Sequence, residues 1–343
     1  MKEFLGLQLP IFMPDATLGA VRALTTGQLE ETGTEMIVVN TFHLLLMYGD
    51  ALMTELGGIK KLMGWKGRVL SDSGGFQVYS LIHQKKNMGK ITSYGAYFTS
   101  PRDGRKVELT PESSIDMQCA IGSDVLITLD DCRHSDVSRK DAEESVRNTT
   151  AWARRARKHF EEKIRETDIS PKLHFAVIQG GSYEDLRKRS AEELQEIGFD
   201  GYCFGGWPIN SRGTLEKEIL EYTSGLLPDD TPKYAMGIGT PDDIRVCFTL
   251  GYKIFDCVLP TRNARHGLLY THDGELRIQK AEFARDQGPI DPKCQCETCT
   301  HYSRAYVHHL LEMHEITGMT LATIHNLAYY SDLLVSLSEG SGK

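Results

Sequence analysis

The strongest constraint on the fold is an alternation of short apolar runs with amphipathic segments over residues 1 to about 260. The runs are continuous and rich in β-branched residues, which is typical of strands buried on both faces. They read MIVVN (36–40), RVLSDS (68–73), DVLITLDD (124–131), HFAVIQ (174–179), GYCFGG (201–206), KYAMGIG (233–239) and KIFDCV (253–258), and HGLLYT (266–271) is expected as an eighth. Strands that alternate with helices predict an α/β protein with a mostly parallel sheet.

The segments between the runs carry helix signals. TPE (110–112) and TPDD (240–243) each place a threonine N-cap before a proline at the first helical position and an acidic residue in the first turn. Residues 141–165 place apolar side chains on one face, at Ala142, Val146, Ala153, Ala156, Phe160 and Ile164. Eight strands joined by helices favour a (β/α)8 barrel of the TIM type. An open doubly wound sheet is the alternative, but no GxGxxG motif follows the first strand.

Composition excludes several classes of protein. With 40% hydrophobic and 25% charged residues, the chain of 343 residues is neither disordered nor fibrous nor a coiled coil. No apolar run approaches the roughly 20 residues that span a bilayer. The N-terminus lacks the charged-then-apolar layout of a signal peptide. We therefore expect a cytoplasmic protein without a membrane partner.

Polar residues end several of the runs, namely Asn40, Asp72, Asp130, Gln179 and Asp256. Active sites of barrels form at the carboxyl ends of the strands, so these side chains are expected at one mouth. Carboxylates there are candidates for a nucleophile and a general acid/base, and a pair could cleave a glycosidic bond by double displacement. A loop cap or a salt bridge explains a single aspartate equally well. The three aspartates together, beside glycine pairs at 74–75 and 205–206, favour catalysis.

A cysteine cluster predicts a metal site near the C-terminus. Cys294, Cys296 and Cys299 are followed by His325 in the apolar stretch TLATIHNLAYY. Three thiolates and one imidazole form a closed tetrahedral set, which predicts a structural Zn²⁺ and not a catalytic one. The alternatives are reduced cysteines in a surface loop, or a different fourth ligand among His301, His308, His309 and His314. The predicted organisation is a barrel in residues 1–265, an inserted zinc-binding subdomain in 266–325, and a helix in 326–343 that closes against the barrel.

Eight strings carry a family resemblance that covers residues from about 10 to 335: NTFHLLL, SDSGGFQV, LDDC, IQGG, MGIGTPDD, FDCVLPTRNAR, KCQCETCTHYSRAY and TIHNLAYY. They resemble the tRNA-guanine transglycosylase (queuine tRNA-ribosyltransferase) family. The combination of FDCVxPTRNAR with CxCxxC and a later histidine is highly specific. The resemblance implies that guanine at the wobble position of a tRNA anticodon is replaced by a 7-deazaguanine base. It also implies a homodimer and tRNAs with a GUN anticodon, which are those for aspartate, asparagine, histidine and tyrosine.

The resemblance assigns roles by position. Asp256 resembles the nucleophile that attacks the ribose C1′ and forms a covalent ribosyl-enzyme, and Asp72 resembles the general acid/base. Arg262 and Arg265 match positions that hold anticodon phosphates. The implied base-binding set comprises Asp130 and Gln179 on the purine edge, the Gly206 N–H on the base carbonyl, Met236 on the floor of the pocket, and Ser73, Phe76 and Cys132 beside them. The target base must be flipped into this site.

One loop departs from the family pattern. The common bacterial segment GGLAVGE is GGWPINS here, at residues 205–211. Ser211 replaces a glutamate that, in family members, supports a peptide whose orientation changes with the bound base. Bulky Ile209 argues against whole queuine, and Cys132 is typical of enzymes that use 7-aminomethyl-7-deazaguanine. The aminomethyl base is therefore favoured as the incoming base, and a queuine-salvaging enzyme is the alternative.

Other classes of function are weighed against this one. A non-catalytic partner subunit usually lacks the nucleophile or the acid/base, yet all the implied site residues are present. A relative that acts on DNA or another RNA region fits less well, because no archaeal-type RNA-binding module follows. A zinc hydrolase also fits less well, because the metal shell is closed. The net charge of −8 argues mildly against RNA. A basic face could be formed by Arg262, Arg265, His266, Arg277, Lys280, Arg285, Lys293 and Arg304, unless the interleaved acidic residues make it ordinary solvated charge.

Overall fold

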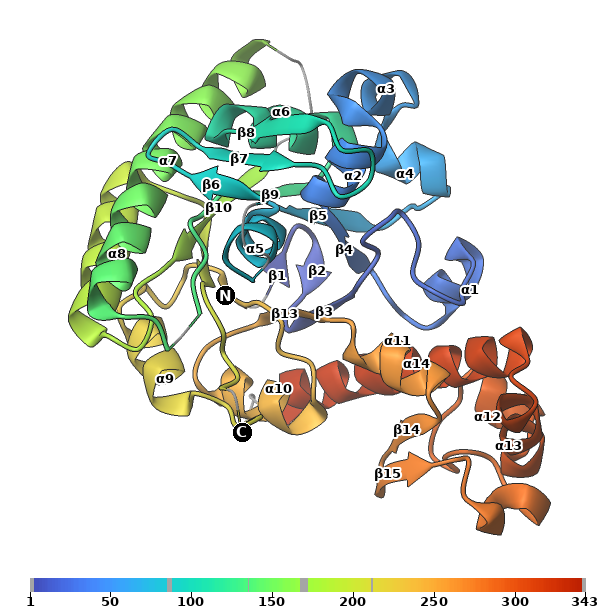
Figure 1. Ribbon diagram of the computed structural model, residues 1–343. Helices are drawn as coiled ribbons and strands as arrows, with labels where there is room; N and C mark the ends of the chain where they lie inside the picture. Colours follow the sequence, from blue (N-terminus) through green and yellow to red (C-terminus); the bar gives the residue numbers. More distant parts are fainter. Residues whose placement is uncertain (1–2, 85–87, 135, 167–171, 211, 341–343) are drawn as a thin grey trace.

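The centre of the molecule is a parallel β-barrel (Figure 1). The computed structural model describes residues 3–84, 88–134, 136–166, 172–210 and 212–340. The strands follow one another around the ring in the order β3 (Ile11–Pro14), β13 (Ile254–Cys257), β12 (Lys233–Ala235), β11 (Gly201–Phe204), β10 (Leu173–Ile178), β9 (Val125–Ile127), β5 (Arg68–Asp72) and β4 (Met36–Asn40). The ring closes between β3 and β4, where the Ala16 N–H donates to the Val38 carbonyl at 2.8 Å. The predicted (β/α)8 fold class is confirmed.

The prediction for the eighth strand is wrong. Leu268–Thr271 forms β14, which pairs antiparallel with β15 (Gly274–Arg277) outside the barrel. Only residues 272 and 273 separate these strands, so a hairpin forms, whereas parallel pairing needs a crossover of a dozen or more residues. The ring is completed instead by β3, an apolar IFMP run near the N-terminus that pairs parallel with β13.

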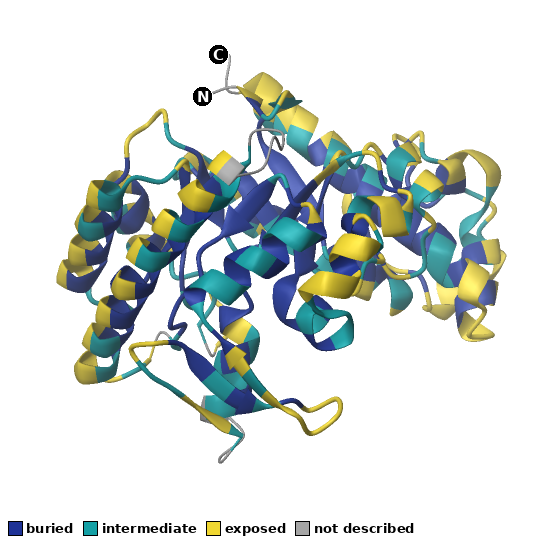
Figure 2. Ribbon diagram, turned by 90° about the horizontal axis from the view of Figure 1, so that it is seen from above, coloured by how far each residue is buried: buried dark blue, intermediate teal, exposed yellow. Residues whose placement is uncertain are grey.

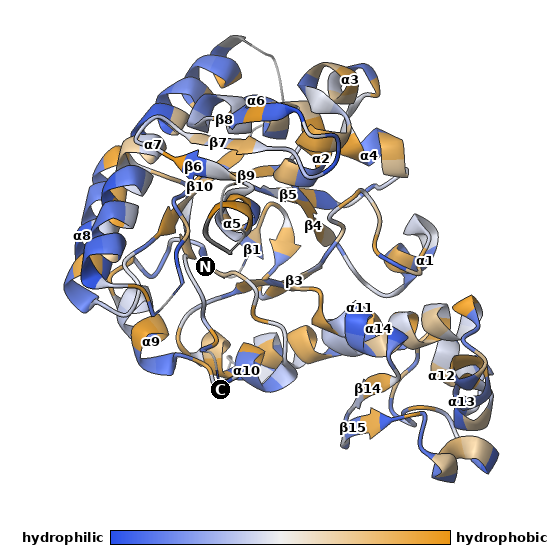
Figure 3. Ribbon diagram, viewed as in Figure 1, coloured by the Kyte–Doolittle hydropathy of each residue, from blue (hydrophilic) through white to orange (hydrophobic). Residues whose placement is uncertain are grey.

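Helices surround the barrel with their polar faces turned to solvent (Figures 2 and 3). They are α1 (Thr26–Glu31), α2 (Thr41–Met47), α3 (Gly49–Glu55), α4 (Gly58–Met63), α6 (Pro111–Ile121), α7 (Arg139–Glu166), α8 (Glu184–Ile197), α9 (Lys217–Gly225) and α10 (Pro241–Thr249). Both predicted caps are confirmed, since the Thr110 Oγ1 accepts from the Ser113 N–H at 3.2 Å and the Thr240 Oγ1 from the Asp243 N–H at 3.1 Å. The predicted apolar face of α7 is also confirmed, with Ala142, Val146, Ala153, Ala156 and Phe160 buried.

Side chains fill the barrel, so its interior is a core and not a channel. Inward-facing residues from all eight strands form this inner core, among them Met13, Val38, Leu70, Ile127, Val177, Cys203, Tyr234 and Ile254. A short hairpin of β1 (Glu3–Phe4) and β2 (Leu7–Gln8) adds Phe4 to the core and lies beside Arg68, the first residue of β5. The hairpin therefore covers the N-terminal end of the barrel. The opposite end carries α5 (Gly75–Tyr79) and a small antiparallel sheet of β6 (Gly89–Ile91), β7 (Ala96–Thr99) and β8 (Lys106–Leu109).

A subdomain projects beside the barrel (Figure 1). It contains β14, β15, α12 (Glu297–His301) and α13 (Arg304–Glu312), and it follows α11 (Leu259–Arg265). The long helix α14 (Ile316–Gly340) packs Leu321 into the subdomain core and Tyr330 into the layer outside the barrel. The predicted boundaries at 265/266 and 325/326 stay predictions, and α14 runs without a break through the second. In the part of the chain that is described, no helix is both long and apolar enough to cross a membrane.

Candidate active site and metal centre

Groups able to bind or react are gathered at one end of the barrel, because the carboxyl ends of parallel strands meet there. Going around the ring, these groups are Asp15 after β3, Asn40 in β4, Asp72 in β5, Asp130 after β9, Gln179 after β10, Gly206 after β11, Met236 after β12 and Asp256 in β13. The structure thus brings the predicted strand-end residues to one mouth. We call this set the mouth ring.

Asp72 is held by its neighbours on β4 and α2. The Asn40 Nδ2 donates to its Oδ2 at 2.5 Å, and the Thr41 N–H donates to its Oδ1 at 3.1 Å. The pKa of Asp72 is raised to about 8, chiefly by burial and then by the charges of Asp256, Asp15 and Asp130, against the Thr41 hydrogen bond. At neutral pH the carboxyl group is therefore mostly protonated and can act as an acid.

Asp256 receives two hydrogen bonds at a single oxygen. The Tyr234 hydroxyl donates to Oδ1 at 2.7 Å, and the Gly237 N–H donates to the same atom at 2.8 Å. Burial raises the pKa of Asp256, while these two donors oppose the rise because they favour the ionised form. Since both donors reach Oδ1, Oδ2 is the oxygen from which we expect nucleophilic attack.

Asp130 and Gln179 form a buried polar pair across β9 and β10. The Gln179 Nε2 donates to the Asp130 Oδ2 at 2.6 Å, and both side chains are buried. Burial raises the pKa of Asp130 to about 6, and the bond from Gln179 opposes this. The next residue, Asp131, has a separate role, because it bonds Arg133 at 2.8 Å and Asn148 at 2.8 Å and so anchors the loop.

Two glycines let the backbone approach this pair. A Cβ on Gly75 would lie 2.4 Å from the Asp130 Oδ1, and a Cβ on Gly205 would lie 2.7 Å from the Gln179 Nε2. Any side chain at either position would displace the pair. Ser73 completes the contact, since its Oγ donates to the Asp130 Oδ1 at 3.4 Å and accepts from the Gly75 N–H at 3.3 Å.

An aromatic cluster lies between α5 and the loop after β11. The Trp207 ring is 5.1 Å from the rings of Phe76 and Tyr79 and 4.9 Å from that of His134, measured between centroids. Phe76 is 49% exposed despite this packing. Trp207, which directly follows Gly206, therefore stands on the mouth side of the loop.

Ile209, whose bulk was expected to act against queuine, packs away from the predicted base contacts. It pairs with Leu215 in an isolated bridge and packs against the core outside the barrel, with Phe204 and Leu220. Only Pro208 separates it from Trp207, yet the two side chains pack in different places, Trp207 against Phe76 and Ile209 against the core outside the barrel. Ser211, whose identity departs from the family pattern, lies outside the described residues.

The other predicted base contacts lie close by. Cys132 is buried close to the Gly206 backbone. Burial raises the pKa of the Cys132 thiol well above its usual value, so the group is neutral. Met236 is half-buried and packs against the inner core at the end of β12.

Both predicted phosphate-binding arginines lie on α11, the helix that follows Asp256. Arg262 is exposed, and Arg265 is half-buried. Within the described residues, the Arg265 Nη1 atom is buried without a hydrogen-bond partner, which fits a guanidinium that awaits an anion. In the subdomain, Lys293 pairs with Asp273 at 2.8 Å and Arg304 with Asp286 at 3.0 Å, so part of the predicted basic face is neutralised.

Sequence reasoning missed two groups of the mouth. Asp15 follows β3 and faces inward like Met13 two residues earlier, and its Oδ1 accepts from the Thr17 N–H at 3.2 Å. Tyr234 lies inside β12 and bonds Asp256. The signal for Asp15 was present, because IFMPD is an apolar run that ends in a carboxylate like the others. Nothing in the sequence marks Tyr234, since only the register of β12 against β13 places its hydroxyl beside Asp256.

A four-residue cluster in the subdomain fits a metal ion. The ligand atoms of Cys294, Cys296, Cys299 and His325 all lie within 4.8 Å of one another, and a tetrahedral zinc ion places its ligands about 3.5–3.8 Å apart. The His325 Nε2 lies 2.8 Å from the Tyr270 carbonyl and so carries the proton, which leaves Nδ1 free for a metal, 3.2 Å from the Cys299 sulfur. Of the histidines considered, His325 is the one that joins the cysteines in this cluster.

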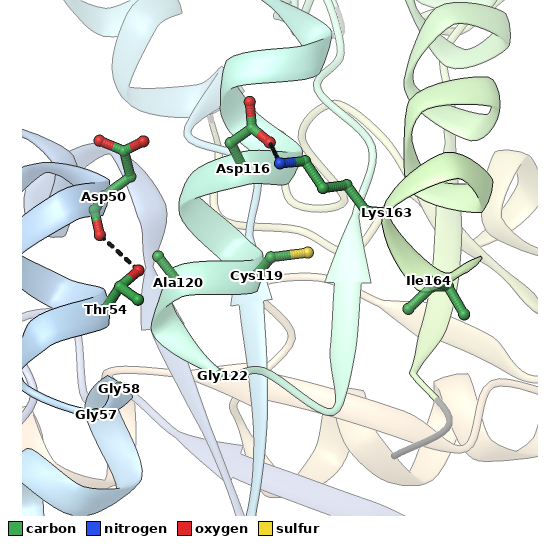
Figure 4. Close-up of a pocket in the computed structure, with 10 residues that line it drawn as sticks. All are labelled: Asp50, Thr54, Gly57, Gly58, Asp116, Cys119, Ala120, Gly122, Lys163 and Ile164. Atoms are coloured by element: carbon green, nitrogen blue, oxygen red, sulfur yellow. Dashed lines mark hydrogen bonds and ion pairs between the residues drawn. The ribbon is translucent and has the colours of Figure 1, made fainter. Parts of the chain in front are cut away.

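A cleft of about 520 Å³ opens elsewhere, between α3, α6 and α7 (Figure 4). Its charged groups include Asp116 and Lys163, which form an ion pair at 2.9 Å. None of the mouth-ring residues lines it. The cleft is thus separate from the candidate chemistry.

Comparisons with known proteins agree with this geometry. A family model described as queuine tRNA-ribosyltransferase matches residues 5–339. Proteins named queuine tRNA-ribosyltransferase are similar along most of the chain. The one from Vibrio campbellii is 42% identical over 96% of this chain and 85% of its own length. That from Methylobacillus flagellatus is 41% identical over 97% and 87%, and that from Thioalkalivibrio sulfidiphilus is 43% identical over 96% and 86%.

Proposed function

Because this chain belongs to the queuine tRNA-ribosyltransferase family, we propose that it exchanges guanine at the wobble position of tRNA for a 7-deazaguanine through a covalent Asp256–ribosyl intermediate. The mouth ring carries the proposal. It sets two carboxyl groups with different hydrogen-bond partners, Asp72 and Asp256, in one site with a buried acceptor and donor pair, Asp130 and Gln179. That combination suits cleavage of a glycosidic bond to a purine.

The reaction is a double displacement. The Asp256 Oδ2 attacks C1′ while the bond from C1′ to N9 of guanine breaks, and protonated Asp72 supplies the proton that the leaving base needs. The incoming base then gives its N9 proton to ionised Asp72, and N9 attacks C1′ to release Asp256. Each step conserves charge and protons, and two inversions give net retention at C1′.

Base recognition follows from the buried pair. Asp130 accepts from the N–H donors on the Watson–Crick edge, and the Gln179 amide and the Gly206 N–H bind the opposite polar atoms of the ring. Ser73 orients Asp130, Met236 and Phe76 flank the ring, and Cys132 lies beside the Gly206 N–H. A base without these donors and acceptors would leave the buried protein groups unpaired. Unpaired buried groups are the usual reason why such a site strongly rejects the wrong base.

The tRNA substrates are those with a GUN anticodon, and Arg262 and Arg265 hold anticodon phosphates. The buried Arg265 Nη1 without a partner supports the second contact. A homodimer also remains a prediction that rests on the family, and a cytoplasmic location remains a prediction that rests on the sequence. A non-catalytic partner subunit would not need Asp72 and Asp256 to be held as they are.

Trp207 favours 7-aminomethyl-7-deazaguanine as the incoming base. O6 and C7 are neighbours on one edge of the ring, so an arm on C7 projects towards the residue that follows the Gly206 N–H. There the Trp207 ring packs against Phe76. Queuine carries an additional cyclopentenediol and would have to displace it, at a cost of about 1–3 kcal/mol for such overpacking. The alternative is a queuine-salvaging enzyme in which Trp207 swings away.

The metal centre is proposed to hold a structural Zn²⁺. Three cysteines and His325 supply a complete shell, so no coordination position is left for a substrate. When bound, the ion would join the loop of Cys294–Cys299 to α14. The protein contributes the pre-set His325 tautomer through Tyr270.

One assay tests both the reaction and the base. A tRNA that carries labelled guanine at the wobble position is incubated with the enzyme and each candidate base. The value of kcat/KM is measured for wild type, Trp207→Ala and Ile209→Ala. We expect base-dependent release of guanine, preference for the aminomethyl base, and about 5- to 150-fold better relative use of queuine in Trp207→Ala only. Absence of release would overturn the proposed reaction. Preference of the wild type for queuine would establish the alternative.

A further inference from the structure

One buried cation in the barrel has no role in the proposed reaction. Arg187 lies in α8 and is 1% exposed. Each guanidinium nitrogen donates to a backbone carbonyl: Nε to Gly181 at 2.9 Å, Nη1 to Ile178 at 2.7 Å, and Nη2 to Gly205 at 2.9 Å. The guanidinium also lies over the Phe204 ring, 4.2 Å from its centroid.

Stability alone does not account for this arginine. No carboxylate forms an ion pair with it among the residues described, and burial lowers the pKa of Arg187 to about 10. A buried charge without a counter-charge is costly, and an apolar side chain of similar volume usually serves a core as well or better. The exposed Arg189 on the same helix, which pairs with Glu193 at 2.7 Å, shows the ordinary arrangement.

Two of the three carbonyls that accept from Arg187 lie at the ends of barrel strands. Ile178 ends β10 and precedes Gln179, and Gly205 follows β11 and precedes Gly206. The Ile178 carbonyl also accepts from the Gly205 N–H at 2.9 Å. Arg187 therefore ties together the ends of the two strands that carry the predicted base contacts.

The bond to Gly205 fixes a peptide plane. In a trans peptide the C=O and the following N–H point in opposite directions. With the Gly205 carbonyl held by Arg187, the Gly206 N–H must therefore point away from the Arg187 guanidinium. Gly206 has φ of +88°, a conformation that lets this peptide rotate easily if nothing holds it.

We propose that Arg187 is a positioning residue that sets the Gly205–Gly206 peptide so that the Gly206 N–H donates to O6 of the purine, and that it thereby selects 6-oxo bases. The inference rests on the proposed function, because it takes Gly206 as a base contact. Arg187 itself does not touch the base.

The test compares two probes that differ at O6. Guanine has the 6-oxo group, and 2-aminopurine lacks it. Inhibition constants of both are measured against tRNA exchange for wild type, Arg187→Lys, Arg187→Met and the matched control Arg189→Lys, with thermal melting of each protein. Lysine keeps the positive charge but cannot donate to all three carbonyls. Arg187→Lys therefore removes these hydrogen bonds with the least disturbance of the fold.

The expected result is a selective loss. Both Arg187 variants should bind guanine about 10-fold more weakly, the value of one lost hydrogen bond, with 2-aminopurine nearly unchanged and Arg189→Lys like wild type. Equal weakening of both probes would reduce Arg187 to a structural residue and overturn the inference, as would no change in either. A wild type that releases no guanine from tRNA would instead contradict the proposed function, so the two failures are distinguishable.

Discussion

The mouth ring and the cysteine cluster use polar residues in opposite ways. At the mouth, Asp72, Asp130 and Asp256 share one end of the barrel with no cationic partner among the described residues, and burial raises the pKa of each. In the cluster, four ligand atoms converge on one point, and the Tyr270 carbonyl pre-sets His325 for it. The first arrangement leaves its carboxyl groups hydrogen-bonded but without a counter-charge, and the second would satisfy its ligand atoms fully once a metal is bound. Changes at the mouth should therefore affect activity, and changes in the cluster should affect stability.

The largest expected effect belongs to Asp256. Asp256→Asn keeps an oxygen acceptor for Tyr234 and Gly237 but cannot attack C1′, so exchange should fall by on the order of 10⁴-fold or more. Denaturing gels should show an enzyme–tRNA band for wild type and none for the variant, while tRNA binding and the melting temperature stay close to normal. Near-normal turnover by Asp256→Asn would remove the nucleophile assignment.

The second prediction concerns the cluster. Cys296→Ala should release zinc and lower Tm by about 5 °C or more, because the binding energy of a structural site is folding energy. Elemental analysis and thermal melting provide the measurement. Cys119→Ala, a cysteine change outside the cluster, serves as the control and should leave both quantities unchanged. A wild type that purifies without zinc, or a Cys296 variant of equal stability, would contradict a structural zinc ion in the cluster.

The pH dependence of exchange should report the raised pKa of Asp72. A pKa of about 8 keeps the acid form through neutral pH, so kcat/KM should hold there and fall as the pH rises above about 8. A profile that falls already from pH 5 would exclude Asp72 as the acid.

The smallest effect is expected from Asp15. Its negative charge contributes to the raised pKa of Asp72, after burial and Asp256. Asp15→Asn should therefore shift the falling limb of the profile to lower pH, while the exposed control Asp229→Asn should not. An unshifted limb in Asp15→Asn would show that its charge does not reach Asp72.

Much of the fold was predictable because its signals are local. Continuous apolar runs fixed seven of the barrel strands, and the caps at Thr110 and Thr240 depend on residues three positions apart. The eighth strand was misplaced because HGLLYT and IFMP are both short strings that can form a strand. Only pairing distinguishes them, since β14 meets β15 within two residues whereas β3 needs its long-range partner β13.

The candidate site was likewise predictable only in part. Residue types and spacing were enough to predict the carboxylates at the strand ends and the cysteine and histidine set, because strand polarity and ligand chemistry follow directly from sequence. Spacing could not show that Trp207 faces Phe76 while Ile209 turns outward, because that depends on how the loop packs.

The sequence by itself determined the barrel class, the catalytic candidates and the candidate metal-binding cysteines. Tertiary structure alone decided that Asp15 closes the ring of strand ends, that Tyr234 bonds Asp256, and that Arg187 holds the peptide before Gly206. The physical reason is that periodicity and residue chemistry act along the chain. Burial, peptide orientation and the pKa of a carboxyl group depend on neighbours that are brought together only when the barrel closes.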